Sequence, residues 1–395
     1  MGGHRYHEAL GFLDEARRRD WDVTLLMNVA AEPSLSAALG GRAVLHDPVF
    51  RQDLTFDERT RAFADLLHEH LDADTSPGDR VLVTVATQCE ARALAAWLGE
   101  LPVGRRPWAV ALFLSDRWNR APAAVGAWDA ALAGPASRAR QLAELAVLGG
   151  DLARLPAAVA RRLILGASTH DLGAELSALL GVPVQGAPMG TFVDAALPSR
   201  DGLPPGLPPS VAVVGGARPE KGSHHLPAII AAARRLCAVD FRIQLANEQL
   251  PPEGFAALAA ALRAGAVELL EGPADRNAYF AFLAGSDLLL LPYERSAYRQ
   301  RLSGVLAEAA LIGMPAVVPS GTWMAQQLES GEIAGVVYTG DGAEAVAGAI
   351  QTAVANLPAL AARAVGQMAA WRQTHTTASF LDWIESEISA RTPRL

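Results

Sequence analysis

Short apolar runs alternate with helix-forming segments along the first half of the chain. Val81 to Thr87, Trp108 to Leu114 and Leu163 to Ala167 each have the length and composition of a buried strand. Helical patterns follow, for example over Gln88 to Leu98 and His170 to Leu180. This alternation predicts a parallel, doubly wound sheet, because a helix crossover joins parallel strands.

The alternation of strand-like and helix-forming segments stops at LPSRDGLPPGLPPS, residues 197–210, where prolines and glycines cluster as in a linker. It resumes with the strand-like runs VAVVGG, FRIQLAN, VELLEG, DLLLLPY, PAVVPS and GVVYTG. The pattern therefore predicts an α/β protein of two Rossmann-like doubly wound domains. We expect an N-terminal domain over 1–196, the linker over 197–210 and a C-terminal domain over 211–395 that includes a closing helical tail.

The chain starts with MGGHRYHEALGFLDEARRRDWDVTLLMN, which reads as a Gly-Gly loop, an amphipathic helix and a strand from Trp21 to Met27. The first lobe thus begins after the strand expected to open it. One interpretation is that this strand is absent. The other, which we favour, is that it lies upstream or is supplied otherwise.

Composition narrows the class of protein. At 395 residues, with 51% hydrophobic and 19% charged residues, the chain suits two packed domains. The net charge of −8 argues against a nucleic-acid binder, which needs a basic surface. Cys89 and Cys237 are too few for a disulfide framework, so we expect a cytoplasmic protein. Apolar stretches such as Leu288 to Leu291 are far shorter than the ~20 residues of a membrane helix, and a peripheral membrane contact stays open.

Lys221 is the only lysine among 34 basic residues. A composition that uses arginine elsewhere suggests that this position needs a compact ammonium, although chance survival is the alternative. Lys221 and Arg218 follow the apolar run VAVVGG, where ligands of open α/β sheets bind, and together they suggest a diphosphate clamp. The alternative is a solvated turn with a surface ion pair.

The stretch YRQRLSGVLAEAALIGMPAVVPSG predicts a helix that Ser303 caps and Gly304 begins. Its free amides form an anion site, and Arg299 and Arg301 add positive charge nearby. Glu308 lies four residues on, hence on the same face and about 6 Å deeper. This spacing suits a ribose diphosphate, with the carboxylate on the diol. A Glu308–arginine pair is the alternative.

These motifs resemble the nucleotide-binding lobe of GT-B-fold glycosyltransferases. The similarity is to the large retaining group 1 family, which includes many bacterial polysaccharide and lipopolysaccharide enzymes. It rests on GGARPEKG, SDLLLLPY and SGVLAEAALIGMPAVV, and more loosely on GGHRYHEAL, LILGASTHDLGAELSALLGVPV and APMGTF in the first lobe. The resemblance implies that the two domains face a cleft, with an acceptor-side N-terminal domain and a nucleotide-sugar-binding C-terminal domain. It also implies a nucleoside-diphosphate sugar donor, a saccharide or lipid-linked acceptor and no tightly bound cofactor. It assigns the following residues to the donor: Gly3, Arg218, Lys221, Arg301, Ser303, Gly304 and Glu308.

The chain departs from the family at two candidate catalytic positions. Two glutamates with seven residues between them are usual, and Gln300 stands at the first, where it carries no charge to stabilise an oxocarbenium ion. Asp116 stands near the position of a usual histidine, as a base if the enzyme inverts or as a helix cap. No metal-ligand spacing is present, and arginine, lysine and a helix dipole can neutralise the departing diphosphate.

Three functions remain open at this stage. A retaining, metal-independent hexosyl-type glycosyltransferase is the leading hypothesis. A nucleotide-sugar epimerase of the same fold would need no acceptor, and a pyridoxal-dependent phosphorylase would need a lysine that the phosphate loop already claims. A nucleotide-sugar-binding scaffold that has lost turnover is the third, favoured by Gln300 and by the absent first strand.

Overall fold

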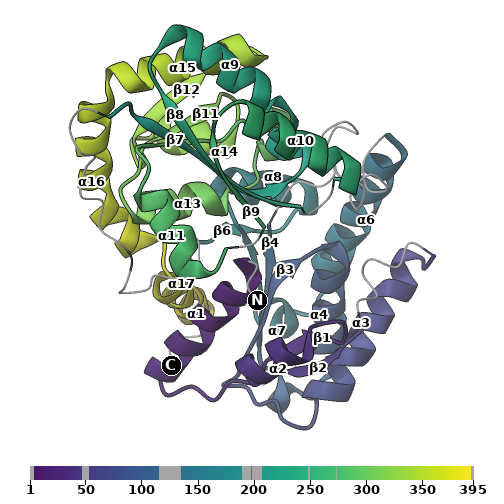
Figure 1. The fold of residues 1–395 in the computed structure, drawn as a ribbon. Coiled ribbons are helices and arrows are strands. Elements are labelled where there is room, and N and C mark those ends of the chain that lie inside the picture. The colour runs from purple at the N-terminus through teal and green to yellow at the C-terminus, as the bar shows by residue number, and fades with distance from the viewer. Residues whose placement is uncertain are drawn as a thin grey trace. The chain divides into compact units, whose positions relative to one another are not determined.

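The computed structural model describes residues 4–46, 53–114, 135–188, 197, 207–247, 250–272 and 274–392, and the chain folds into two compact units (Figure 1). The first contains 6–118, 139–192 and 376–395, and the second 193–375 together with 1–5 and 119–138. Asp116, Gly3 and most of the predicted linker lie outside the described residues.

Two parallel sheets form the first unit. One is the pair of β1 (Leu26–Asn28) and β2 (Arg42–Leu45), and the other has the order β3-β4-β5-β6. Its strands are β3 (Arg80–Ala86), β4 (Trp108–Phe113), β5 (Leu163–Ala167) and β6 (Gln185–Gly186). The helical elements are α1 (His4–Arg18), α2 (Pro33–Leu39), α3 (Phe56–Leu71), α4 (Gln88–Glu100), η2 (Val103–Arg105), α6 (Pro135–Ala153), α7 (Ala157–Ala160) and α8 (His170–Leu180).

The second unit is built on one six-stranded parallel sheet, in the order β12-β11-β10-β7-β8-β9. Its strands are β7 (Ser210–Ala217), β8 (Asp240–Asn247), β9 (Glu268–Glu271), β10 (Leu288–Leu290), β11 (Ala316–Pro319) and β12 (Gly335–Tyr338). The helical elements are η5 (Pro219–Lys221), η6 (Ser223–His225), α9 (Leu226–Leu236), α10 (Pro252–Ala264), α11 (Arg276–Ala284), α12 (Arg295–Tyr298), α13 (Gly304–Leu311), α14 (Trp323–Glu329), α15 (Ala343–Ala355) and α16 (Leu357–Thr374).

The predicted fold class is confirmed, since parallel strands alternate with helices in both units. Helix α8 and strand β5 have the predicted bounds, and β3 and β4 differ from the predictions by one residue. The strand expected from Trp21 to Met27 was largely wrong, because regular pairing starts only at Leu26. Two guanidinium groups instead lie over the ring of Trp21, with Arg19 at 5.5 Å and Arg80 at 5.3 Å from its centroid.

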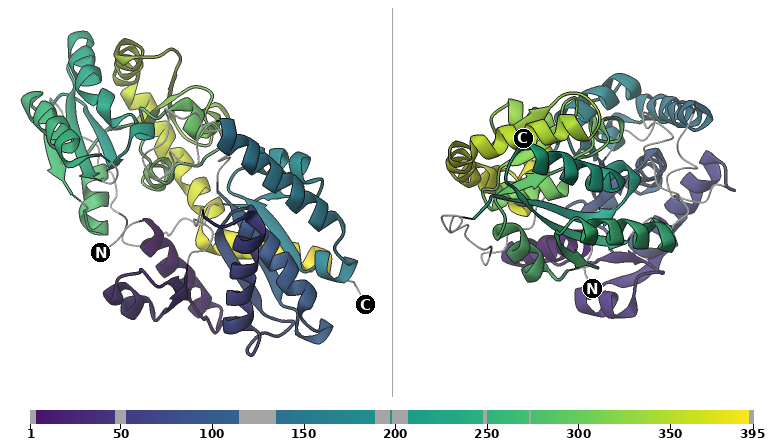
Figure 2. Two further views of the ribbon diagram at one scale, coloured as in Figure 1. Left: turned by 90° about the vertical axis from the view of Figure 1, so that its right-hand side faces the viewer. Right: turned by 45° about the horizontal axis from the view of Figure 1, so that its top comes forward.

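The predicted helical tail is two helices that belong to different units. Helix α16 packs in the second unit, whereas α17 (Thr377–Arg391) belongs to the first (Figure 2). The predicted C-terminal domain of 211–395 therefore ends too late, at the tail. The reason is the apolar face of α17, which contributes Phe380, Leu381, Ile384 and Ile388 to a core with alternate residues of β4.

Replacing Phe380 with leucine tests that contact. Phe380 is 2% exposed and meets Phe12 edge to face, with 5.5 Å between ring centroids. We expect Phe380→Leu to lower the free energy of unfolding by about 1–1.5 kcal/mol, through lost packing, in a denaturant titration. Val365→Ala, at a residue 51% exposed on α16, is the control and should change it by less than about 0.5 kcal/mol. Equal effects would contradict a packing role for α17.

Among the described residues, no single helix has the length and hydropathy to cross a bilayer. Helices α15 and α16 meet the two criteria only when taken together, and they are bent by 81°.

Candidate functional site

The candidate site lies where the strand order of the second unit reverses. Strand β7 pairs with β8 on one side and with β10 on the other, so the loops after β7 and β10 leave the same edge of the sheet in opposite directions. The first loop carries Arg218 and Lys221, and the second leads through α12 to α13. Two segments about eighty residues apart are thereby brought together.

Lys221 extends back over the end of β7. Gly215 has a φ of +118°, and a β-carbon built there would lie 2.9 Å from the Nζ of Lys221 and 4.0 Å from a methyl of Val305. The ammonium thus lies beside both the β7 backbone and the first turn of α13. It is also 6.0 Å from the ring centroid of Tyr293, which follows β10. The lone lysine and the first turn of the Ser-Gly helix therefore both lie next to Gly215.

A buried carboxylate lies between two arginines of the site. Glu220 is 2% exposed, and its Oε1 is 3.9 Å from Nη1 of Arg218 and 4.0 Å from Nη1 of Arg301. These distances exceed hydrogen-bond length, so the attraction is electrostatic. The other oxygen, Oε2, has no hydrogen-bond partner among the described residues. Glu220 therefore places its negative charge near two guanidinium groups at once.

Tyr293 is the buried aromatic residue of this cluster. Burial raises the pKa of its phenol, while Ser303, Arg301 and Arg218 act in the opposite direction. Its hydroxyl makes no well-formed hydrogen bond with the described residues, although Ser303 is near enough to affect the pKa. The ring of Tyr298 lies 4.4 Å away, centroid to centroid. Tyr293 thus stays neutral and gives the cations an aromatic surface.

Ser303 caps α13 as predicted. Its Oγ accepts a hydrogen bond of 3.2 Å from the backbone N–H of Leu306, and the helix begins at Gly304. Gly304, Val305 and Glu308 are only partly buried, whereas the other residues of α13 are buried. The open face of the helix therefore includes its N-terminal turn and the single acid.

Removing the cap should weaken the helix start. We expect Ser303→Ala to lower the free energy of unfolding by about 1 kcal/mol, because the amide of Leu306 loses its acceptor. Thermal denaturation measures this loss, and Ser303→Thr should restore most of it. A stable Ser303→Ala variant would show that the cap contributes nothing.

Glu308 has a partner from another helix. Its Oε2 accepts a hydrogen bond of 2.6 Å from the hydroxyl of Tyr279, on α11. An aromatic ring and a carboxylate are thus fixed side by side, one helical turn from the N-terminal end of α13. Charge-assisted hydrogen bonds of this kind orient a carboxylate strongly.

Gln300 is 6% exposed and lies between α12 and the cap of α13. Of the predicted site residues, the structure brings together Arg218, Lys221, Arg301, Ser303 and Gly304, with Glu308 one turn along. Sequence reasoning missed Glu220 and Tyr293 as site residues. Both stand in the quoted motifs GGARPEKG and SDLLLLPY, and a tyrosine directly after a buried strand was the available signal.

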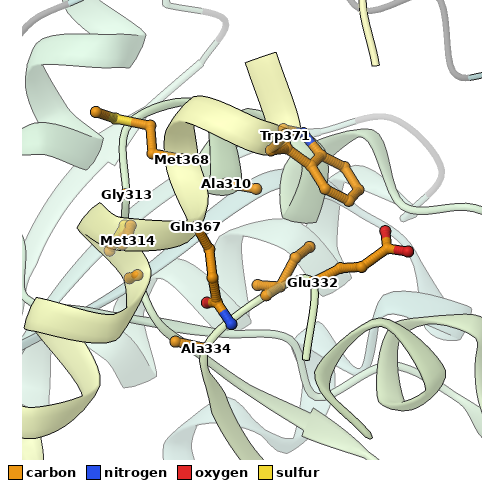
Figure 3. A pocket seen from close by; sticks show the side chains of 10 residues that line it. Ala310, Gly313, Met314, Glu332, Ala334, Gln367, Met368 and Trp371 are labelled. Carbon is orange, nitrogen blue, oxygen red and sulfur yellow. The ribbon is translucent and has the colours of Figure 1, made fainter. Parts of the chain in front are cut away.

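One small pocket lies elsewhere in this unit, between the end of α13 and helix α16 (Figure 3). Glu332, Gln367 and Trp371 are among its lining residues. Its volume of about 10 Å³ admits at most one water molecule. The pocket is therefore too small for a sugar nucleotide. Within the described ranges, no group of three or more metal-ligating side chains comes together.

Comparisons with known proteins agree with this architecture. No family model and no curated protein matches the sequence. A solved structure of Alr3699/HepE from Anabaena, in complex with UDP, has a TM-score of 0.64 and 16% identity, over 98% of this chain and 96% of that chain. A glycosyltransferase from Rickettsia africae has a TM-score of 0.66 and 11% identity, over 99% and 95%.

A third solved structure is WaaG, a glycosyltransferase involved in lipopolysaccharide biosynthesis. It has a TM-score of 0.59 and 17% identity, over 98% of this chain and 96% of that chain. Structural similarity at such low sequence identity establishes the fold alone. The chemistry has to be argued from the residues of the site. The chain therefore has the fold of the GT-B glycosyltransferases over nearly its whole length.

Proposed function

We propose that this protein is a glycosyltransferase that moves a sugar from a nucleoside-diphosphate sugar to an acceptor. The observation that carries the proposal is the meeting of Lys221, Arg218 and Arg301 with the capped start of α13, one turn before Glu308. The nucleotide-binding function of HepE, which was solved with UDP and with UDP-glucose, supports UDP as the first ligand to test.

Charge matching supports a diphosphate. Three cations and the carboxylate of Glu220 sum to a net charge of about +2, close to that of a sugar-linked diphosphate with the sign reversed. The N-terminal turn of α13 adds partial positive charge and free N–H groups. On cleavage of the sugar–phosphate bond the leaving diphosphate gains a charge, which these groups stabilise without a metal ion.

Glu308 and Tyr279 match the nucleoside. A carboxylate can accept two hydrogen bonds from a vicinal diol, and the phenol of Tyr279 already orients it. The Tyr279 ring beside it offers a surface on which a base can stack. The ligand's diphosphate would then lie at the helix tip and its ribose one turn along.

Transfer with retention and a hexose donor are our proposals for the finer chemistry. Gln300 would contact the donor sugar as a neutral hydrogen-bonding group, while Gly3 would approach the donor through its backbone. Asp116 is the candidate base if the reaction inverts. The acceptor would be a saccharide or a lipid-linked saccharide.

The test is a two-stage assay. Calorimetry with UDP, GDP and ADP identifies the nucleotide, and release of that nucleotide from a panel of its sugar esters is then measured with and without saccharide acceptors. We expect binding of one nucleotide and acceptor-dependent release. If none of the three nucleotides bound, the proposal would be refuted.

An epimerase is the second candidate. A Listeria monocytogenes protein assigned as a UDP-N-acetylglucosamine 2-epimerase has a related structure, with a TM-score of 0.56 and 15% identity. Conversion of the donor sugar without any acceptor would favour it. Tight nucleotide binding with neither release nor epimerisation would favour a binding scaffold.

A further inference from the structure

A glutamine lies inside the sheet of the second unit, where a parallel strand usually carries an apolar residue. Gln244 is on β8, between β7 and β9 (Figure 1), and is 4% exposed. Its neighbours along the strand, Ile243 and Leu245, belong to the apolar core. Burying an amide costs free energy unless its polar groups find partners, so the partners of Gln244 indicate why it is there.

The Gln244 amide bonds to the backbone at the ends of both neighbouring strands. Its Oε1 accepts a hydrogen bond of 3.1 Å from the N–H of Gly215, near the end of β7. Its Nε2 donates one of 2.6 Å to the carbonyl of Gly272, directly after β9. Because an N–H only donates and a carbonyl only accepts, these partners fix the orientation of the amide. Gln244 therefore ties the carboxyl ends of β7 and β9 together across β8.

The first of these glycines lies under the ammonium of the proposed diphosphate site. Gly215 has a φ of +118°, and no side chain of its own restricts that conformation. The bond from Gln244 fixes the plane of the Val214–Gly215 peptide, since the peptide group is planar. A β-carbon at Gly215 would lie 2.9 Å from Nζ of Lys221, so the conformation of Gly215 sets the space that the ammonium occupies.

The second glycine precedes the helix at the proposed ribose end. Gly272 also donates its N–H to the carbonyl of Leu245, at 3.0 Å, so both its N–H and its C=O bond to β8. Three residues later Asp275 caps α11. Tyr279 of that helix donates the hydrogen bond that holds Glu308. The position of Gly272 therefore influences where α11 starts and where its tyrosine lies.

We propose that Gln244 is a positioning residue of the nucleotide site. It holds Lys221 at the diphosphate end through Gly215, and Tyr279 at the ribose end through Gly272. The inference rests on the proposed glycosyltransferase function, because the site that Gln244 serves is the donor site. A single planar amide sets the distance between the two loops, and an apolar residue in its place would leave a buried N–H and a buried C=O without these partners.

The test is a double-mutant cycle with Lys221→Ala. Binding is measured by calorimetry with UDP, or with GDP or ADP if one of those is the nucleotide that binds. In the intact chain Lys221→Ala should weaken binding by at least about 30-fold. In a Gln244→Leu background the same substitution should cost less than about fivefold, because the ammonium is no longer held for the diphosphate. Gln244→Leu alone should weaken binding by at least about tenfold.

Two further variants separate positioning from a purely structural role. Gln244→Glu keeps an oxygen that accepts from Gly215, so Lys221→Ala should still cost more than about 20-fold there, and this variant serves if Gln244→Leu does not fold. Ser286→Ala is the matched control, since it removes a different buried hydrogen bond of this unit, the one of 3.1 Å to the carbonyl of Phe282. It should change the cost of Lys221→Ala by less than about twofold.

A second measurement needs no ligand. Hydrogen exchange is followed by mass spectrometry in peptides that contain Gly215 and Gly272. Both should exchange at least about tenfold faster in Gln244→Leu than in the intact chain, because the two loops lose their common partner. Ser286→Ala should leave exchange at both glycines unchanged.

The outcomes distinguish this inference from the proposed function. If UDP bound and Lys221→Ala cost as much in the Gln244→Leu background as in the intact chain, the inference would be wrong and the proposed function would stand. Unchanged exchange at both glycines in Gln244→Leu would also contradict the inference. A protein that bound none of the three nucleotides would refute the proposed function and this inference with it.

Discussion

Lys221→Ala is expected to weaken the binding of UDP, or of whichever nucleotide calorimetry identifies, by about 30- to 100-fold. The ammonium lies between the end of β7 and the first turn of α13, where a bound diphosphate would accept its hydrogen bonds. A hydrogen bond to a charged group contributes about 1.5–3 kcal/mol, and 1.4 kcal/mol corresponds to a factor of ten.

The control for Lys221→Ala is Arg235→Ala, which removes one positive charge from the exposed end of α9. Arg235 pairs there with Glu344 at the surface. We expect less than about a twofold change, because exposed charges act weakly at a distance. Lys221→Arg should not fully restore binding, since a planar fork does not reproduce the compact ammonium that lies over Gly215. Comparable losses in Lys221→Ala and Arg235→Ala would show that only net charge matters.

Glu308→Ala should remove the preference for a ribose diol. We expect the intact protein to bind UDP at least about tenfold more tightly than its 2′,3′-dideoxy analogue, and the Glu308→Ala variant to bind both equally weakly, as a double-mutant cycle of protein and ligand measures. The physical reason is that the carboxylate is the group able to accept both ribose hydroxyls.

Tyr279→Phe is the matched control for Glu308→Ala. It removes the 2.6 Å hydrogen bond to Glu308 but keeps the carboxylate and the ring. The preference for the diol should persist, with affinity lowered only about two- to fivefold. A Glu308→Ala variant that still distinguished the two ligands would place the ribose elsewhere.

Much of the candidate site was predictable because its signals are local. A serine before Gly304 indicates a cap within one helical turn, and the four-residue spacing to Glu308 sets the shared face. Lys221 stood out by count alone. None of these inferences needs to know which strand lies beside which.

The partners of these residues were not predictable in the same way. Tyr279 and Glu308 are on different helices, and no repeat or spacing links them. Glu220 reads in sequence as one more surface acid in a charged loop. Its burial between Arg218 and Arg301 depends on α12 and α13 folding over the β7 loop. Similarly, the apolar face of α17 predicts that this helix packs against a core, but it does not indicate which unit provides that core.

The sequence by itself determined the alternation of strands and helices in both units, the capped start of α13 and the residue types suited to a diphosphate and a diol. These follow from backbone hydrogen bonding and side-chain periodicity over one element at a time. Only the tertiary structure decided that β7 lies beside β10 and that α17 belongs to the first unit. Those outcomes depend on which buried faces and strand edges meet, and distant segments of the chain compete for them.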